Sequence, residues 1–252
     1  MKLNTKILFL FDVDGTLSPS RQKAPEMIIN MLNKLRDRVL TGFVGGSDLK
    51  KQKEQIGDNV LDIFHYGFPE NGVQFYEKGK LKDTSSILEY LGEDAYKKLV
   101  NCLFVLLSEV DCPVKRGSFF ELRDSMLNVS PVGRSCSQEE RKEFFEYDKI
   151  HKIREKICEQ VTGKFLDHKI KCSIGGEISI DIFPEGWDKT YCLRHIDESI
   201  KIYFFGDMTS KGGNDYEIFS HKRVIGHTVR GCEDTLRQVN KTLKDLGIEE
   251  IN

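Results

Sequence analysis

Two carboxylates follow directly after a short apolar run near the start of the chain. The run Lys6–Leu10 leads into Phe11–Leu17, which has the sequence FDVDGTL. An apolar run of this length that ends at a turn is typical of a buried strand in a parallel sheet, and Gly15 permits a sharp turn because it has no Cβ. Ligands of open α/β sheets bind beyond the carboxyl ends of the strands, where Asp12 and Asp14 stand. Because two carboxylates this close repel each other, we expect a cation or a shared proton beside them.

The whole string from Asp12 to Thr16 is more specific than the pair of carboxylates, which by itself also occurs in solvated turns. The string resembles the first motif of the haloacid dehalogenase superfamily of phosphotransferases. The resemblance implies that Asp12 is a nucleophile that attacks phosphorus and that Asp14 is a general acid/base. It also implies that a Mg²⁺ ion binds at this turn.

Composition argues against several classes of partner. The 252 residues include 38 basic and 40 acidic side chains, for a net charge of −2, so we expect neither nucleic acid nor a membrane as a partner. No apolar run reaches membrane-spanning length, and the first residues lack the pattern of a cleavable signal peptide. The seven cysteines are scattered and form no C-x-x-C pair, which argues against zinc and against a secreted disulfide framework. We therefore expect reduced thiols and a cytoplasmic location.

Apolar strands alternate with amphipathic helices at the two ends of the chain. In the first helix, one buried face is predicted from the spacing i, i+3, i+4, i+7 of four apolar residues: Ile28, Met31, Leu32 and Leu35. The alternation stops near Leu81 and resumes after Trp187. We therefore expect residues 1–81 and 188–252 to form a doubly wound α/β core with a parallel sheet, and residues 82–187 to form an inserted α/β cap domain.

Two segments of the expected insert have clear patterns. Ser137 and Glu140 form a capping box, which predicts one helix from residue 137 to about residue 161. The last strand of the insert, Ile178–Phe183, alternates isoleucines with polar residues, so the two kinds of side chain lie on opposite faces. That polar face either meets solvent or binds a ligand, and its residues are Ser179 and Asp181.

Polar residues at other strand ends could contact a phosphate group. Ser47 follows Gly45 and Gly46 at the end of the strand Val39–Val44, where a hydroxyl and backbone N–H groups can bind phosphate oxygens. The Ser-Asp pair at this point is also an ordinary N-cap for the next helix, and both roles can hold together. Arg21, in the loop after the first motif, is either solvated or a phosphate contact.

Three more charged residues complete the candidate site. Lys189 lies at the start of a predicted helix, Asp207 follows the strand Ile200–Phe205, and Asp215 comes shortly after. A carboxylate approaches anionic phosphorus only where that charge is neutralised, and Mg²⁺ with its oxygen ligands and a lysine can both do so. All of these residues stand in the order of the superfamily. We expect Asp12, Asp14 and Asp207 to bind Mg²⁺ with support from Asp215, and Ser47 and Lys189 to take part in catalysis.

Long stretches of the insert and its flanks look like the eukaryotic-type α-phosphomannomutases. The resemblance is carried by four segments: Glu121–Arg141, Ser173–Gly176, Phe183–Lys189 and Tyr203–Asp207. It implies that the substrate, a hexose phosphate, is bound by Arg21, Arg123, Arg134, Arg141, Ser179 and Asp181. It further implies a hexose 1,6-bisphosphate activator, a homodimer formed through the cap, and supply of mannose 1-phosphate for GDP-mannose synthesis. The chain departs from the family at Phe219–His221, where an acidic residue of a second cation site is often found, so occupancy of that second site stays open.

The resemblance implies interconversion of mannose 6-phosphate and mannose 1-phosphate through an aspartyl phosphate on Asp12. The enzyme alternative is a phosphatase of sugar phosphates or nucleotides, in which water takes the phosphoryl group. The alternative outside catalysis is an inactive protein that binds sugar phosphates, which the intact set of charged residues argues against. The preference between mannose and glucose stays open. So does the role of Leu103, Phe104 and Leu107, which suit either the core of the cap or a dimer interface.

Overall fold

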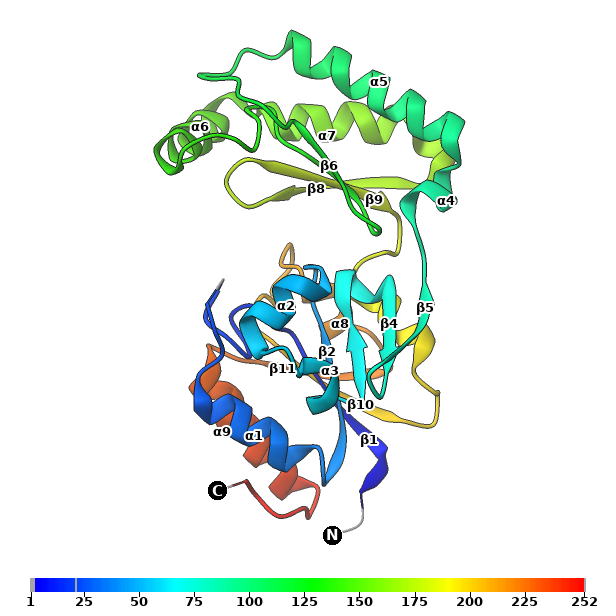
Figure 1. Cartoon of the computed structure of the whole chain (residues 1–252), viewed down its shortest axis with the longest axis vertical. Helices are drawn as coiled ribbons and strands as arrows, with labels where there is room; N and C mark the ends of the chain where they lie inside the picture. The colour runs from blue at the N-terminus through cyan, green and yellow to red at the C-terminus, as the bar shows by residue number, and fades with distance from the viewer. Residues whose placement is uncertain (1–2, 21, 252) are drawn as a thin grey trace. The chain divides into compact units, whose positions relative to one another are not determined.

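The computed structural model describes residues 3–20 and 22–251, and it divides into two compact units (Figure 1). The core unit comprises residues 1–84 and 187–252, and the inserted unit comprises residues 85–186. Within the described part of the chain, every helix is too short or too polar to cross a membrane.

The core unit is built on a seven-stranded sheet with the order β11-β10-β1-β2-β3-β4-β5. The pairs from β11 through β3 are parallel, whereas β4 and β5 continue the sheet in antiparallel fashion. The strands are β1 (Asn4–Phe11), β2 (Val39–Val44), β3 (Tyr66–Phe68), β4 (Gln74–Glu77), β5 (Lys80–Thr84), β10 (Lys201–Gly206) and β11 (Val224–Thr228). The parallel arrangement confirms the expected fold class.

Helices cover both faces of this sheet, as expected for a doubly wound core. On one face, Phe9 and Phe11 of β1 belong to an apolar cluster with the buried residues of α1 and α9. On the other face, Leu8 and Leu10 pack in a second cluster with η3 and α8. The helical elements are α1 (Glu26–Leu35), α2 (Leu49–Ile56), α3 (Val60–Ile63), η1 (Pro69–Gly72), η3 (Lys189–His195), α8 (Tyr216–Phe219) and α9 (Cys232–Asp245).

The inserted unit has its own antiparallel sheet, with the order β6-β7-β9-β8. Helices α5 and α7 run along one side of this sheet in Figure 1. Its elements are α4 (Ile87–Leu91), α5 (Glu93–Glu109), β6 (Phe120–Leu122), β7 (Leu127–Val129), α6 (Gln138–His151), α7 (Ile153–Lys164), η2 (Leu166–His168), β8 (Ile170–Gly175) and β9 (Ser179–Pro184).

Period-two alternation places the two faces of β9 as predicted. Its isoleucines are buried in the cluster that also holds residues of α5 and α7, while Ser179 and Asp181 on the opposite face are half-buried. The three apolar residues of α5 that suited two roles differ in burial. Leu103 and Leu107 are buried in the same cluster, whereas Phe104 is 55% exposed.

The single helix predicted from residue 137 to about residue 161 is wrong, because α6 and α7 are separate helices. The capping box of Ser137 and Glu140 does open α6. The break lies at Lys152, whose φ of 56° is left-handed. A buried ion pair holds this junction, because Asp148 accepts a bond from the backbone N–H of Arg154 at 3.0 Å and another from its Nε at 2.7 Å. No local pattern of apolar residues signals such a break, because the partners that hold it are charged.

Candidate active site

Three adjacent parallel strands place the candidate residues of the core unit at one edge of the sheet. β1 lies between β10 and β2, with Phe11 opposite both Phe205 and Phe43. Asp12 therefore follows the end of β1, Asp207 follows β10, and Ser47 lies in the loop after β2. This is the edge at which open α/β sheets bind ligands.

A cluster of carboxylates forms at this edge. Asp12, Asp207 and Asp215 each offer one oxygen atom, and these atoms all lie within 4.8 Å of one another. Asp12 and Asp215 are buried, and Asp207 is half-buried. The backbone N–H of Met208 donates to Asp215 at 3.0 Å, which fixes the second oxygen of that carboxylate. Hard oxygen ligands in this number suit a divalent cation.

Lys189 is the cation within this cluster. Its ammonium group donates to Asp12 and, at 2.5 Å, to Asp215, and the side chain is only 1% exposed. Burial alone would lower the pKa of Lys189, but the charges of Asp12 and Asp215 raise it overall, so the ammonium group stays protonated. The side chain is placed by η3, whose first turn is capped by Asp188 through the backbone N–H of Thr190.

Even with Lys189 present, the negative charge of the cluster is only partly compensated. Burial raises the pKa of Asp12 to about 7, against the opposing charge of Lys189. Burial, and then the charge of Asp215, raises the pKa of Asp207 as well. Carboxylates held this way favour either protonation or a further cation. The donor set and its charge therefore fit a bound Mg²⁺ ion.

Two glycines make room for the carboxylates. A Cβ on Gly15 would lie 2.3 Å from Oδ2 of Asp207, and its φ of +79° is one that L side chains rarely adopt. A Cβ on Gly206 would lie 2.6 Å from Oδ2 of Asp215. Gly15 of the first motif is thus required by packing as well as by the turn.

The side chain of Asp14 lies outside the group of three carboxylates that the structure gathers. The sequence predicts Asp14 as a metal ligand with Asp215 in support, but the group contains Asp215 and not Asp14. Gln55 of α2 donates instead to Oδ1 of Asp14 at 2.8 Å, and to the hydroxyl of Ser18 at 3.2 Å.

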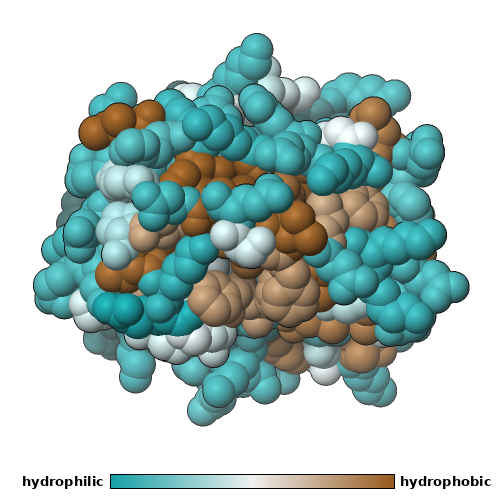
Figure 2. Space-filling view, turned by 90° about the horizontal axis from the view of Figure 1, so that it is seen from above, coloured by the Kyte–Doolittle hydropathy of each residue, from teal (hydrophilic) through white to brown (hydrophobic). Residues whose placement is uncertain are grey.

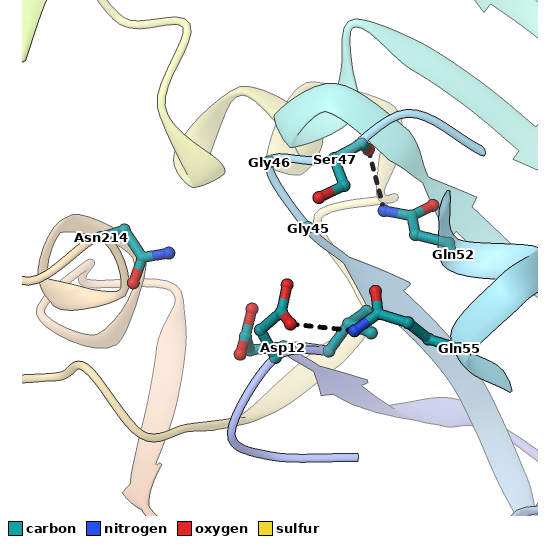
Figure 3. A pocket seen from close by; sticks show the side chains of 9 residues that line it. Asp12, Gly45, Gly46, Ser47, Gln52, Gln55 and Asn214 are labelled. Atoms are coloured by element: carbon teal, nitrogen blue, oxygen red, sulfur yellow. Dashed lines mark hydrogen bonds between the residues drawn. The ribbon is translucent and has the colours of Figure 1, made fainter. Parts of the chain in front are cut away.

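A pocket of about 140 Å³ opens beside these carboxylates (Figure 3). It is lined by Asp12, Val13, Asp14, Gly45, Gly46, Ser47, Gln52, Gln55 and Asn214. The Ser-Asp pair does supply the N-cap of α2, through Asp48, which accepts from the backbone N–H of Lys51 at 2.8 Å. Gln52 holds the loop by donating to the carbonyl oxygen of Ser47 at 3.1 Å. Ser47 thus lies at the pocket wall, and the bond that holds its loop uses its carbonyl oxygen and not its hydroxyl.

In the inserted unit, polar residues form a row across three strands on the face opposite the helices. Glu121 of β6 pairs with Asn128 of β7, and Asn128 pairs with Asp181 of β9. Directly opposite residues of antiparallel strands project from the same face. Asn128 is 4% exposed and donates to Oδ1 of Asp181 at 2.5 Å. Burial raises the pKa of Asp181, although the bond from Asn128 and two nearby arginines oppose the shift.

The predicted arginines of the inserted unit join this row. Nε of Arg123 donates to one oxygen of Glu121 at 2.7 Å, and Nε of Arg134 meets the other oxygen at 2.7 Å. Arg134 also donates to the side-chain oxygen of Asn128. Arg141 of α6 donates to the backbone carbonyl of Arg134 at 2.6 Å. The structure thus joins Arg123 and Arg134 to the polar row, and it joins Arg141 to the backbone of Arg134.

Two predicted site residues remain, Ser179 and Arg21. Ser179 lies on β9 two residues before Asp181 and projects from the same polar face. Arg21 lies outside the described residues, so its role stays a prediction.

Three polar residues of the site were missed in the sequence. Gln55 follows Gln52 by three positions, so the two share a helix face that could have been recognised as facing the carboxyl end of β2. Glu121 precedes Arg123 by two positions, which on a strand places them on one face. Asn128 has no such local signal, because its partners Arg134 and Asp181 are brought to it by the sheet register.

Known proteins similar in sequence share one description. A family model for eukaryotic phosphomannomutase matches residues 28–245. The phosphomannomutase of Encephalitozoon cuniculi is 56% identical over 98% of this chain and 98% of its own length. Those of Galdieria sulphuraria and Saccharomyces cerevisiae are 52% and 51% identical, each over 94% of this chain and over 95% and 94% of their own lengths.

Solved structures with a similar fold are more distant in sequence. A trehalose-6-phosphate phosphatase related protein has a TM-score of 0.56 and 16% identity, covering 95% of this chain and 98% of its own. An IMP-bound mutant of the Plasmodium falciparum IMP-nucleotidase has a TM-score of 0.59 and 14% identity, covering 96% of this chain and 67% of its own. At such identities the likeness concerns the fold alone, and it agrees with the expected haloacid dehalogenase fold.

Proposed function

The chain belongs to the eukaryotic phosphomannomutase family, and from that premise we propose that it interconverts mannose 6-phosphate and mannose 1-phosphate. The observation that supports this chemistry most directly is the bonding of Lys189 to both Asp12 and Asp215 at the carboxyl edge of the core sheet. A buried cation beside a carboxylate nucleophile is what transfer of an anionic phosphoryl group requires. The product, mannose 1-phosphate, would supply GDP-mannose synthesis in the cytoplasm.

Asp12 is the nucleophile of the proposed reaction. Its oxygen attacks a phosphorus of a hexose 1,6-bisphosphate, the bond from that phosphorus to the sugar oxygen breaks, and a hexose monophosphate leaves. The free hydroxyl of a hexose monophosphate then attacks the aspartyl phosphate and regenerates Asp12. Lys189 places a positive charge beside the Asp12 carboxylate, which takes part in both displacements. The bisphosphate formed in this second transfer must turn around before it gives its other phosphate back to Asp12, and isomerisation results.

Asp14 is the proposed general acid/base. It gives a proton to the sugar oxygen as that oxygen leaves the phosphorus that Asp12 attacks. In the second transfer, it takes a proton from the attacking hydroxyl. Gln55 orients this carboxylate through the bond of 2.8 Å to Oδ1. Ser47 lies at the wall of the same pocket, and in this proposal its hydroxyl donates to a phosphate oxygen.

Mg²⁺ is the cofactor that the core unit would hold. Asp12, Asp207 and Asp215 supply carboxylate oxygens close enough to share one ion. When bound, Mg²⁺ neutralises part of the charge on the transferring phosphoryl group. Asp14, whose side chain lies outside this group, serves in proton transfer.

The inserted unit would bind the phosphate that is not reacting. Arginines form paired, charged hydrogen bonds to phosphate oxygens. Arg123 and Arg134 lie on one face of this unit, and Arg141 contacts the backbone of Arg134. On the same face, Ser179 and Asp181 offer groups that suit sugar hydroxyls. A homodimer formed through this unit is part of the proposal.

An assay with and without activator tests the proposal. The protein is incubated with mannose 1-phosphate and Mg²⁺, in the presence or absence of glucose 1,6-bisphosphate, and mannose 6-phosphate and free phosphate are measured together. We expect mannose 6-phosphate to form rapidly only with the bisphosphate. Free phosphate without mannose 6-phosphate would identify a phosphatase, and neither product would indicate a protein that only binds sugar phosphates.

A further inference from the structure

One carboxylate occupies the middle of the arginine face in the inserted unit. Glu121 contributes each of its two oxygens to a different arginine, at 2.7 Å from Nε of Arg123 and 2.7 Å from Nε of Arg134. These bonds use the Nε atoms and not the terminal nitrogen atoms of either guanidinium. An anionic side chain at the centre of a proposed phosphate site opposes phosphate binding, so its presence needs a reason.

We propose that Glu121 is an internal competitor of the substrate phosphate, which weakens phosphate binding so that the bisphosphate can leave the arginines and turn around. The proposal deepens the proposed function and rests on it. In a phosphatase, a substrate phosphate is bound once and the product is released. In a mutase, the arginines must release one phosphate of the bisphosphate and accept the other, so binding that is too tight slows turnover.

The charges on this face are nearly balanced without a ligand. Arg123 and Arg134 carry two positive charges, and the carboxylates of Glu121 and Asp181 oppose them. The pKa of Asp181 reflects the same balance of charges. Burial raises this pKa and the bond from Asn128 lowers it. Of the charged neighbours, the two arginines lower it and Glu121 raises it. A phosphate on the same face would be attracted by the same arginines and repelled by the same carboxylate.

Geometry also lets Glu121 take the place of a departing phosphate. Both arginines already contact it, so neither guanidinium is left without an anion when the phosphate leaves. The side chains of Glu121, Arg123 and Arg134 are 38%, 28% and 33% exposed, so water and salt reach this ion-pair group. Partly exposed pairs of this kind are weak and are exchanged easily.

The opposite role for Glu121 predicts the opposite result. If Glu121 only holds the arginines in place, then its removal scatters them and weakens phosphate binding. If Glu121 competes with phosphate, then its removal strengthens binding. Arg134 keeps its bond to Asn128 in either case, and Arg123 keeps the bond from its backbone N–H to Met126 at 2.9 Å.

Calorimetric titration of the full-length protein with inorganic phosphate and with mannose 6-phosphate tests the proposal. Glu121→Gln removes the charge, and Glu121→Ala removes the hydrogen-bond acceptor as well. The matched control is Glu146→Gln, which removes one negative charge from an exposed pair with Lys149 on α6. We expect both Glu121 variants to bind the two ligands roughly fivefold tighter, the effect of one partly exposed charge, and the control to bind as the unchanged protein does.

Steady-state kinetics complete the test. Glu121→Gln should lower both KM for mannose 1-phosphate and kcat, because tighter binding slows the turn of the bisphosphate. Gain of affinity cannot arise from misfolding, so a tighter Kd together with a lower kcat supports the proposal. Unchanged or weaker phosphate binding in both variants overturns it, and so does tighter binding with an undiminished kcat. If the unchanged protein does not isomerise mannose phosphates, the proposed function fails, while the titration with inorganic phosphate still decides whether Glu121 opposes anions.

Discussion

Asp12 and Lys189 form the contact on which the proposed chemistry depends most. We predict that Asp12→Asn lowers turnover by roughly a thousandfold or more, because an amide is a poor nucleophile. The fold should survive, since asparagine has nearly the same shape and Lys189 keeps its bond of 2.5 Å to Asp215. Transfer of label from a radiolabelled hexose bisphosphate to the protein, measured beside the melting temperature, checks both statements. Labelling of the variant would contradict the assignment of the nucleophile.

Gln55 donates to Asp14 and orients it in the proposed mechanism. We predict that Gln55→Leu lowers kcat by roughly 10- to 100-fold, because a misplaced acid/base group transfers protons poorly, while KM changes little. Gln52→Leu provides the comparison, since Gln52 lies on the same helix and holds the carbonyl oxygen of Ser47 instead of Asp14. A fall in kcat of equal size in both variants would show that burial on α2 matters rather than the contact with Asp14.

Residues in a local pattern were predictable from the sequence, and residues joined by the fold were not. Asp12 and Asp207 stand directly after apolar strands, so their place at the edge of the sheet follows from the strand pattern. The contact of Lys189 with Asp215 is different. Both residues lie in short, irregular segments, and only the packing of η3 and α8 brings them together. The resemblance to a family supplied what the pattern of apolar residues could not.

At the scale of elements, the sequence was reliable where apolar periodicity decides the structure. The strand β2 has the predicted bounds, Val39–Val44, and the four residues predicted to form the inner face of α1 are all buried. Prediction from the sequence was unreliable where charged groups decide the structure. The break between α6 and α7 depends on the buried pair of Asp148 and Arg154. Charged residues in a helix are ordinarily solvated, so nothing in the spacing marks this pair as buried.

The same pair yields a prediction of stability. Arg154 also donates from Nη1 to the carbonyl oxygen of Gly176 at 3.0 Å, so it joins the junction of α6 and α7 to the hairpin of β8 and β9. We predict that Arg154→Met lowers the free energy of unfolding by roughly 3–5 kcal/mol, because it leaves Asp148 buried without its cation. Denaturant unfolding of the full chain measures the change.

The exposed pair of Lys149 and Glu146 lies on α6, the helix that carries Asp148, and provides the control. Lys149→Met should cost less than about 1 kcal/mol, since exposed ion pairs contribute little. The double variant Asp148→Leu with Arg154→Met should recover part of the loss, because it removes both buried charges. Similar losses in Arg154→Met and Lys149→Met would show that the pair does not stabilise the junction.

At the scale of the whole molecule, the apolar surface of the inserted unit matters for assembly. Figure 2 shows apolar residues gathered across the middle of the face seen from above in Figure 1, with polar residues around them. Two neighbouring residues of α5, Phe104 and Val105, are 55% and 53% exposed. The ring of Phe104 meets that of Phe120 edge to face, with centroids 4.8 Å apart, so it is held in place while still exposed. A fixed apolar surface of this kind is typical of an interface.

We therefore predict that the protein is a dimer in solution and that Phe104→Asp converts it to a monomer. The new charge would be buried in an apolar interface without a partner, which destabilises the dimer. Loss of the apolar and aromatic contacts of Phe104 destabilises it further. Sedimentation velocity across a range of protein concentrations measures the change. Ile150→Asp is the control, because Ile150 is exposed on α6 of the same unit and carries the same change of charge. An interface at α5 would be contradicted if the unchanged protein is a monomer or if Phe104→Asp leaves the dimer intact. Dissociation by both variants would show that the added net charge, and not the position of Phe104, separates the subunits.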